Sequence, residues 1–335
     1  MSLSDAAVPM PLDDARPASP TLRHRKVGVI GAGAVGTAIC YAALIRGVAR
    51  EVALYDIDGP KVRAEVLDLA HGTAFTSTTQ MTGGDDPAVL ADAEVVVITA
   101  GAKQKPGQTR LDLAEANIAI LRTLLPTVQS VAPDALIVLV SNPVDVLTLA
   151  AQRITGLPAG RVIGSGTLLD TSRLRWQLAS RVHVHPSSVH AVILGEHGDT
   201  EFPVWSSASI GPTPLLAWPD ADAPAFTREQ LDGIAHEVTH AAYEVIQGKG
   251  ATNYAIGVAT TRLLEAILRD QHAILPVSTV MDGVMGLADV ALSLPSVVGR
   301  GGVERVLAVE LDEDERARLA TSAETLRTVA AQFGF

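Results

Sequence analysis

The segment Lys26-Val-Gly-Val-Ile-Gly-Ala-Gly-Ala-Val-Gly36 decides the fold of this chain. Its apolar beginning predicts a short strand, and Gly31, Gly33 and Gly36 follow at once and lead into a helical stretch. In such a turn the first glycine allows a tight bend, the second lets a pyrophosphate approach the backbone, and the third lets the helix pack closely on the strand. Free N–H groups at the start of the helix attract phosphate. The segment therefore predicts a dinucleotide-binding unit.

An acidic residue at the end of the next strand indicates which dinucleotide this unit binds. Asp56 lies 20 residues beyond Gly36 and directly follows the apolar run Glu51–Tyr55. A carboxylate at this position accepts hydrogen bonds from the ribose hydroxyls and repels a 2′-phosphate. We therefore expect NAD rather than NADP. The alternative is that Asp56 only caps the end of its strand.

Outward from the glycine turn, short apolar runs alternate with longer amphipathic ones. The short runs are rich in β-branched residues and too short for helices, which is typical of parallel strands buried on both faces. We expect these strands at Lys26–Ile30, Glu51–Tyr55, Glu94–Thr99 and Leu136–Val140, with helices between them. This alternation predicts an α/β protein with a Rossmann fold, that is, a doubly wound parallel sheet.

The second half of the chain has a more mixed pattern, which predicts an α+β domain. The expected strands are Val189–Leu194, Ala273–Val280 and Val290–Leu294, and the expected helices are Thr227–Gln247, Tyr254–Arg269 and Glu313–Ala331. We expect three regions: a loose tail over 1–24, an NAD-binding Rossmann domain over 25–165 and a C-terminal substrate domain over 166–335.

Composition excludes several classes of function. The 335 residues include 26 Lys+Arg and 37 Asp+Glu, and the resulting net charge of -11 gives no general attraction to nucleic acid or to an anionic membrane. No apolar run reaches the roughly 18 residues that a membrane span needs. The first residues lack the basic and apolar regions of a secretion signal. We expect a cytoplasmic protein.

Four polar residues in the chain suit the reduction of a carbonyl group. His197 lies between Gly195-Glu and Gly198, just past a predicted strand. Asp170 and Arg173 are spaced i and i+3, so they share one face of a predicted helix. A carboxylate can orient the imidazole of a general acid, and an arginine can hold a substrate carboxylate by two hydrogen bonds. Arg110 ends a Gly- and Pro-containing loop that starts at the carboxyl edge of the sheet and could close as a lid.

Several motifs, in this order, resemble the lactate/malate dehydrogenase family over nearly the whole chain. They are Val29-Ile-Gly-Ala-Gly-Ala-Val-Gly36, Tyr55-Asp-Ile-Asp58, Gln104-Lys-Pro-Gly-Gln-Thr-Arg110, Ser141-Asn-Pro-Val-Asp145, Asp170-Thr-Ser-Arg173 and Gly195-Glu-His-Gly-Asp-Thr200. The resemblance implies that His197 exchanges the proton, that Asp170 orients it, that Arg173 holds the substrate carboxylate, and that Arg110 polarises the reacting carbonyl.

The resemblance also implies the residues around substrate and cofactor. Asn142 and Thr252 match positions that contact the substrate, and Ile256 matches the residue that packs on the nicotinamide. The cofactor positions expected from the motifs are Gly31, Gly33, Ala34, Val35, Gly36, Asp56, Thr99, Gly101, Asn142 and Ile256. Gln104 occupies the position that contacts the far end of the substrate. Glutamine there implies pyruvate and L-lactate, whereas arginine would pair with the second carboxylate of oxaloacetate.

Arg175 and His190 match the residues that bind fructose 1,6-bisphosphate in bacterial members of the family, at an interface within a homotetramer. Two symmetry-related cationic pairs suit a sugar with two phosphates. The alternative is a surface arginine and a structural strand histidine.

Three readings of the function stay open. The first is reduction of pyruvate, the second is reduction of oxaloacetate or another 2-oxoacid, and the third is an NAD-binding protein that keeps only the scaffold, including an NAD- and metal-dependent glycosidase. We expect no metal site, because His236 and His240 lack a third ligand and Cys40, the single cysteine, lies in the helix after the glycine turn.

Overall fold

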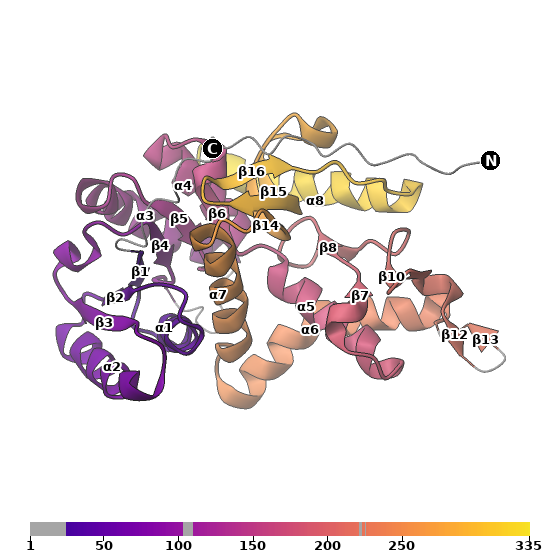
Figure 1. Cartoon of the computed structure of the whole chain (residues 1–335). Coiled ribbons are helices and arrows are strands. Elements are labelled where there is room, and N and C mark those ends of the chain that lie inside the picture. Colours follow the sequence, from indigo (N-terminus) through magenta and orange to yellow (C-terminus); the bar gives the residue numbers. More distant parts are fainter. Residues whose placement is uncertain (1–24, 103–109, 221–222, 225) are drawn as a thin grey trace, which may run out of the picture.

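A computed structural model describes residues 25–102, 110–220, 223–224 and 226–335 (Figure 1). Its centre is a nine-stranded sheet with the order β16-β15-β14-β6-β5-β4-β1-β2-β3. Six of its strands are parallel: β1 (Lys26–Ile30), β2 (Glu51–Tyr55), β3 (Gln80–Gly84), β4 (Val95–Ile98), β5 (Leu136–Leu139) and β6 (Val162–Gly164). The order 3-2-1-4-5-6 is that of the Rossmann fold, which confirms the predicted fold class.

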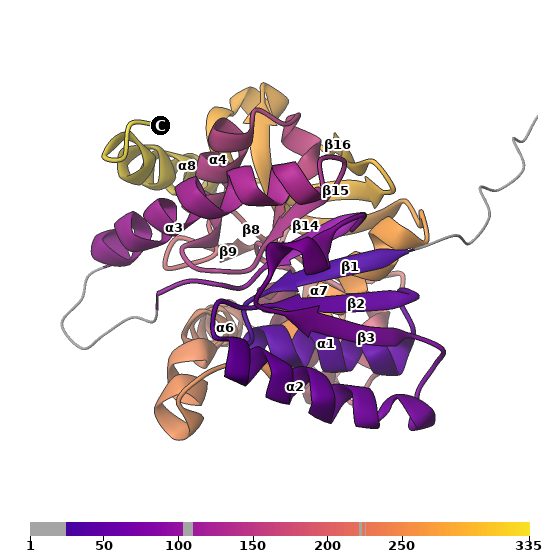
Figure 2. The ribbon, with the colours of Figure 1, turned by 90° about the vertical axis from the view of Figure 1, so that its left-hand side faces the viewer.

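Helices cover both faces of the parallel strands (Figure 2). On one face α1 (Ala34–Arg46) and α7 (Tyr254–Leu268) pack on the apolar cluster that contains Val27 and Val29, and α2 (Gly59–His71) lies beside α1. On the other face lie α3 (Arg110–Val131), α4 (Val144–Thr155) and α8 (Glu313–Ala331). Because β4 is buried on both faces, its sequence Val-Val-Val-Ile has no polar alternation.

The C-terminal strands continue the same sheet in the opposite direction. They are β14 (Ala273–Asp282), β15 (Ala288–Gly299) and β16 (Gly302–Val306), and β14 joins β6 by an antiparallel pairing. One sheet therefore spans both predicted domains. The boundary near residue 165 stays a prediction, as does the tail over 1–24, which lies outside the described residues.

The predicted single strand Val189–Leu194 is wrong. Its ends form two short strands in different sheets: β7 (Val189–His190) pairs with β10 (Ser209–Ile210), and β8 (Ile193–Leu194) pairs with β9 (Phe202–Pro203). β10 also pairs with β11 (Thr213–Pro214), and a separate hairpin joins β12 (Pro219–Asp220) to β13 (Ala223–Pro224). His190 is exposed within this mostly apolar run, and long-range packing, which periodicity does not record, gives the two ends of the run different partner strands.

Two long helices complete the C-terminal half. They are α5 (Leu168–Arg181) and α6 (Arg228–Lys249), and their apolar faces share a cluster that contains Leu174, Leu178 and Leu231. The sequence pattern missed α4 and the strands β3, β6, β9–β13 and β16. In β3 only Met81 is buried, because an edge strand needs little apolar surface. Within the described part of the chain, no helix is long and apolar enough to cross a membrane.

Candidate active site

The glycine turn has the geometry that a dinucleotide requires. Gly31 has φ of +107°, a conformation that other residues rarely adopt, and its N–H donates to the carbonyl of Tyr55 at 2.8 Å. A side chain at Gly36 would collide with the backbone oxygen of Gly31, whereas one at Gly33 would meet nothing within 4 Å. The open space at Gly33 lies at the start of α1, where Ala34 and Val35 begin the helix. The residues present therefore fit the pyrophosphate of NAD.

Asp56 lies directly against this turn. One carboxylate oxygen accepts a hydrogen bond from the N–H of Ala32 at 2.6 Å, and the other accepts one from Asp58 at 3.0 Å. The side chain therefore stabilises the glycine turn. Each carboxylate oxygen has a second acceptor direction, so the carboxylate also retains capacity for ribose hydroxyls.

The next predicted cofactor residues lie at the carboxyl ends of β4 and β5. The Thr99 hydroxyl donates to the carbonyl of Ile30 at 2.9 Å, which ties β4 to the glycine turn. Gly101 follows it and Asn142 follows β5, and both are exposed. These positions share the edge at which Rossmann sheets bind ligands.

Sequence reasoning missed Asn117 on α3. Its side chain accepts from the N–H of Ala102 at 2.7 Å and donates to the carbonyl of Asn142 at 2.7 Å. It thereby joins Ala102, after β4, to the loop after β5. A polar residue that is 3% exposed on an otherwise apolar helix face was the signal that could have revealed it.

His197, Asp170 and Arg173 come together in one cluster. His197 Nδ1 lies 2.6 Å from Asp170 Oδ2, and Arg173 Nη1 donates to Asp170 Oδ1 at 2.7 Å. The Asp170 side chain is 2% exposed, whereas those of His197 and Arg173 are 25% and 19% exposed. A buried carboxylate thus holds an imidazole and a guanidinium that both reach solvent.

The cluster shifts the pKa values of its members. Burial alone would lower the pKa of His197, but the charge of Asp170 and its hydrogen bond outweigh burial and raise that pKa to about 9. Burial alone would raise the pKa of Asp170, but the charge and hydrogen bond of His197 and the charge of Arg173 hold it below its usual value. At neutral pH this arrangement therefore favours a protonated imidazole, the form that a proton donor needs.

Two further acidic residues support the cluster, and sequence reasoning assigned a role to neither. Asp145, at the start of α4, accepts a hydrogen bond from the backbone N–H of His197 at 2.7 Å, and burial raises its pKa to about 6. Glu201 lies near both His197 and Asp170, with ligand atoms of the three within 4.8 Å of one another. Asp145 ends one quoted motif and Glu201 directly follows another, but the packing of α4 and of the turn after His197 is what brings both to the cluster.

The remaining predicted substrate residues are partly described. Gln104 lies outside the described residues, and Arg110 begins α3 but its side chain is not described. Thr252 precedes α7, and Ile256 lies in its first turn; both are partly buried. A side chain at the next residue, Gly257, would meet the backbone of Ala38 at 2.9 Å, so this end of α7 packs directly on α1.

Arg175 is hydrogen-bonded to the backbone of the residue that follows His190. Arg175 Nε donates to the carbonyl of Ala191 at 2.9 Å, next to His190, whose side chain is exposed. Burial lowers the pKa of Arg175. Because Arg173 bonds Asp170, the two arginines leave α5 in different directions, as their spacing predicts.

Among the described residues, two groups of three side chains have ligand atoms close enough for a metal ion. One is Asp170, His197 and Glu201, where the guanidinium of Arg173 already neutralises Asp170 and opposes a cation. The other is exposed and contains Asp270, His272 and Glu304. That the site binds no metal stays a prediction.

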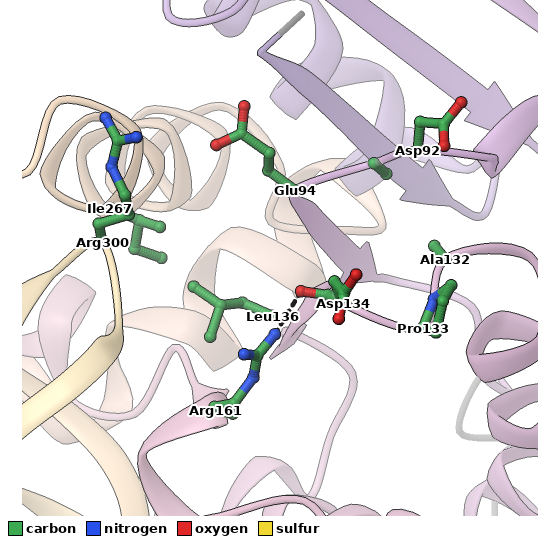
Figure 3. Close-up of a pocket in the computed structure, with 10 residues that line it drawn as sticks. Asp92, Glu94, Ala132, Pro133, Asp134, Leu136, Arg161, Ile267 and Arg300 are labelled. Carbon is green, nitrogen blue, oxygen red and sulfur yellow. Dashed lines mark hydrogen bonds between the residues drawn. The ribbon is translucent and has the colours of Figure 1, made fainter. Parts of the chain in front are cut away.

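A pocket of 360 Å³ lies at the amino ends of β4, β5 and β6, opposite the cofactor edge (Figure 3). Side chains of both charges line it: Asp92, Glu94, Asp134, Arg161 and Arg300. Arg161 is fixed there by a hydrogen bond to the backbone oxygen of Asp134. The pocket contains none of the residues predicted to bind cofactor or substrate.

Comparison with known proteins agrees with this geometry over almost the whole chain. A family model described as "lactate/malate dehydrogenase, NAD binding domain" matches residues 25–164, and one described as "lactate/malate dehydrogenase, alpha/beta C-terminal domain" matches residues 167–333. An L-lactate dehydrogenase of Bifidobacterium animalis subsp. lactis (strain AD011) is 48% identical over 315 residues, which are 94% of this chain and 98% of the relative. One from Thermus aquaticus is 44% identical over 312 residues, 92% of this chain and 100% of the relative.

Solved structures give the same result. A minor L-lactate dehydrogenase from Enterococcus mundtii, solved with ligands bound, superimposes with a TM-score of 0.88 at 40% identity, covering 92% of this chain and 98% of that one. Fold, glycine turn and matches together define an oxidoreductase that uses NAD. The chain belongs to the lactate/malate dehydrogenase family.

Proposed function

We propose that this protein is an L-lactate dehydrogenase, which interconverts pyruvate and L-lactate with NADH and NAD. The observation that carries the proposal is the buried contact of Asp170 with both His197 and Arg173, at 2.6 and 2.7 Å. It puts a protonated imidazole beside a guanidinium, so one small molecule can meet both. The names of the relatives support the choice of substrate.

Arg173 binds and orients the substrate in this proposal. Its Nη1 is engaged by Asp170, and the rest of the guanidinium is available for the carboxylate of pyruvate. This contact fixes the distance of the keto group from the nicotinamide. Ile256 contacts the nicotinamide, and Asn142 and Thr252 contact the substrate. NADH supplies the hydride when it is bound.

His197 supplies the proton. Charge that develops on the keto oxygen is met by the proton on the free imidazole nitrogen and by Arg110, and Asp170 stabilises the charged imidazole before the transfer. In the reverse direction the neutral imidazole accepts the proton from the hydroxyl of L-lactate. Thr99, Gly101 and the glycine turn bind the cofactor.

The test is steady-state oxidation of NADH with pyruvate and, separately, with oxaloacetate, each with and without fructose 1,6-bisphosphate. We expect pyruvate to be preferred. A preference for oxaloacetate would instead indicate malate dehydrogenase activity, and activity with no 2-oxoacid would indicate that only the NAD-binding scaffold remains.

The rate of pyruvate reduction should depend on pH through His197. Its raised pKa of about 9 means that the imidazole is protonated below that value. With the chemical step rate-limiting, kcat/KM for pyruvate is expected to be constant toward neutral pH and to fall by about tenfold for each further pH unit above this pKa. Oxidation of L-lactate needs the neutral form, so its rate should rise over the same range. Flat profiles in both directions would remove His197 from this role.

Gln104 is proposed to select pyruvate against oxaloacetate. Burying the second carboxylate of oxaloacetate without a partner costs on the order of 3–5 kcal/mol. Gln104→Arg is therefore expected to raise the ratio of kcat/KM for oxaloacetate to that for pyruvate by roughly two orders of magnitude. Gln108→Arg adds the same charge four residues further on and serves as the control. An unchanged ratio in the Gln104 variant would contradict the assignment.

The same proposal includes an effector site, a homotetramer and a cytoplasmic location. Arg175 is hydrogen-bonded to the carbonyl of the residue that follows His190, and in this proposal the two cationic side chains bind one phosphate group of fructose 1,6-bisphosphate together. Exposed apolar side chains on α1, α6 and α7 support an assembly that covers them: Tyr41, Ile45, Tyr243, Ile246, Tyr254 and Val258. Sedimentation of the purified protein measures the assembly, and a lower apparent KM for pyruvate with the sugar bisphosphate measures activation.

A further inference from the structure

Glu201 is a second carboxyl group beside the His197 and Asp170 pair, and the mechanism above gives it no role. The residue follows the turn that carries His197, and its N–H donates to the carbonyl of Gly198 at 3.1 Å, which bends the chain back. The ligand atoms of Glu201, His197 and Asp170 all lie within 4.8 Å of one another. The turn therefore directs a third titratable side chain into the cluster.

The two carboxyl groups have unequal support. Asp170 has His197 at 2.6 Å and Arg173 at 2.7 Å, so its charge is well compensated. Glu201 has a buried Oε1 without a hydrogen-bond partner among the described residues, and the Thr239 hydroxyl of α6 faces its carboxyl group. When two carboxyl groups share a buried site, the less supported one keeps its proton. Here that group is Glu201.

Electrostatics agree with this division. Burial and then the charge of Asp170 raise the pKa of Glu201 to about 9, against the opposing effects of His197, Thr239 and Arg173. A negative charge on Glu201 in turn raises the pKa of His197. Asp145 acts on His197 in the same direction from α4, and it faces the backbone N–H of the histidine.

We propose that Glu201 is a positioning residue of this site. Its carboxyl group is neutral at neutral pH, and once it loses its proton, its negative charge makes His197 bind its own proton more tightly. It acts through charge on the proton donor and does not itself touch the substrate. The inference rests on the proposed role of His197 in reducing a 2-oxoacid. It adds Glu201 to Asp170 and Asp145 as a third acidic side chain that controls the proton donor.

The experiment is a pH titration of the His197 imidazole by NMR, in the full-length protein labelled at histidine and free of cofactor and substrate. The sequence contains nine histidines, so the His197 signal is assigned by its loss in His197→Asn. Glu201→Gln cannot become negative, and we expect it to lower the pKa of His197 by about 1. In the original protein the coupling of His197 to Glu201 should give the His197 signal a two-step titration, and in Glu201→Gln the titration should become a single step.

Two variants make the result specific. Glu237→Gln removes an exposed carboxylate from α6 and should leave the His197 titration unchanged. Thr239→Val removes the hydroxyl that helps Glu201 to ionise. It should therefore also lower the pKa of His197, but by less than Glu201→Gln does. This second variant also tests the proposal if Glu201→Gln does not fold.

Activity gives an independent readout. In Glu201→Gln the alkaline fall of kcat/KM for pyruvate should move to lower pH together with the NMR titration. An unchanged His197 titration in both Glu201→Gln and Thr239→Val overturns the inference, even in an active enzyme. Conversely, a shifted titration in a protein that reduces no 2-oxoacid overturns the proposed function and leaves the control of His197 by Glu201 standing.

Discussion

Replacing His197 with asparagine is expected to lower kcat for pyruvate reduction by roughly 10²–10⁴-fold, the range that a positioned general acid contributes. The expectation follows from the environment of the imidazole. Asp170 holds Nδ1 at 2.6 Å and raises the pKa of His197 to about 9, so at neutral pH the ring carries the proton that the keto oxygen requires. Asparagine can still donate a hydrogen bond to Asp170, but it cannot give up a proton.

Stopped-flow measurement of NADH oxidation gives kcat for the chemical step in this variant, and fluorescence titration gives the affinity for NADH. The affinity should stay within a few-fold, because the glycine turn is distant in sequence and untouched. His236→Asn, at an exposed position on α6, is the matched control and should keep its activity. A His197 variant that reduces pyruvate at nearly the original rate would rule out the proposed proton donor.

Replacing Arg173 with glutamine is expected to reduce kcat/KM for pyruvate by roughly 10³-fold. Loss of one partner of a hydrogen-bonded charge pair costs about 2–5 kcal/mol, and here the substrate carboxylate and Asp170 both lose a partner. For Arg173→Lys, kcat/KM for pyruvate should lie between the values of the original protein and of Arg173→Gln, because lysine keeps the charge but cannot form two parallel hydrogen bonds with a carboxylate.

The comparison that checks this prediction is KM against kcat for the three proteins, with thermal unfolding to measure the effect on stability. A rise in KM is the expected signature of a lost substrate contact. Arg181→Gln changes an exposed arginine at the end of the same helix, α5, and should leave both constants unchanged. An Arg173→Gln protein with the original KM would move the substrate carboxylate to another residue.

Most of the parallel half of the sheet could be predicted, because its signals are local. Runs such as Val95–Ile98 are buried on both faces, so they are apolar throughout and easily recognised. β3 was missed because an edge strand buries only one residue, Met81. The split of Val189–Leu194 between two sheets was missed because pairing partners are chosen by residues far along the chain.

The candidate site divides in the same way. The spacing of Asp170 and Arg173 predicts a shared helix face, and the structure has them 2.7 Å apart. The link from Asp170 to His197 crosses 27 residues, and the resemblance to a family suggested it where spacing could not. Asp145 stands in a quoted motif and Asn117 on an otherwise apolar helix face, but neither pattern gave the role of these residues or of Glu201, because that role depends on which elements pack beside them.

The sequence by itself therefore determined the cofactor half of this protein. Gly31 must adopt a positive φ, and Gly36 must have no side chain; glycine as a residue type meets both requirements. The tertiary structure alone decided the electrostatics of the proton donor. The charge state of His197 depends on distances to Asp170, Asp145 and Glu201, which come from α5, α4 and the turn before β9. Such distances are set by packing between elements, and no pattern within a single element records them.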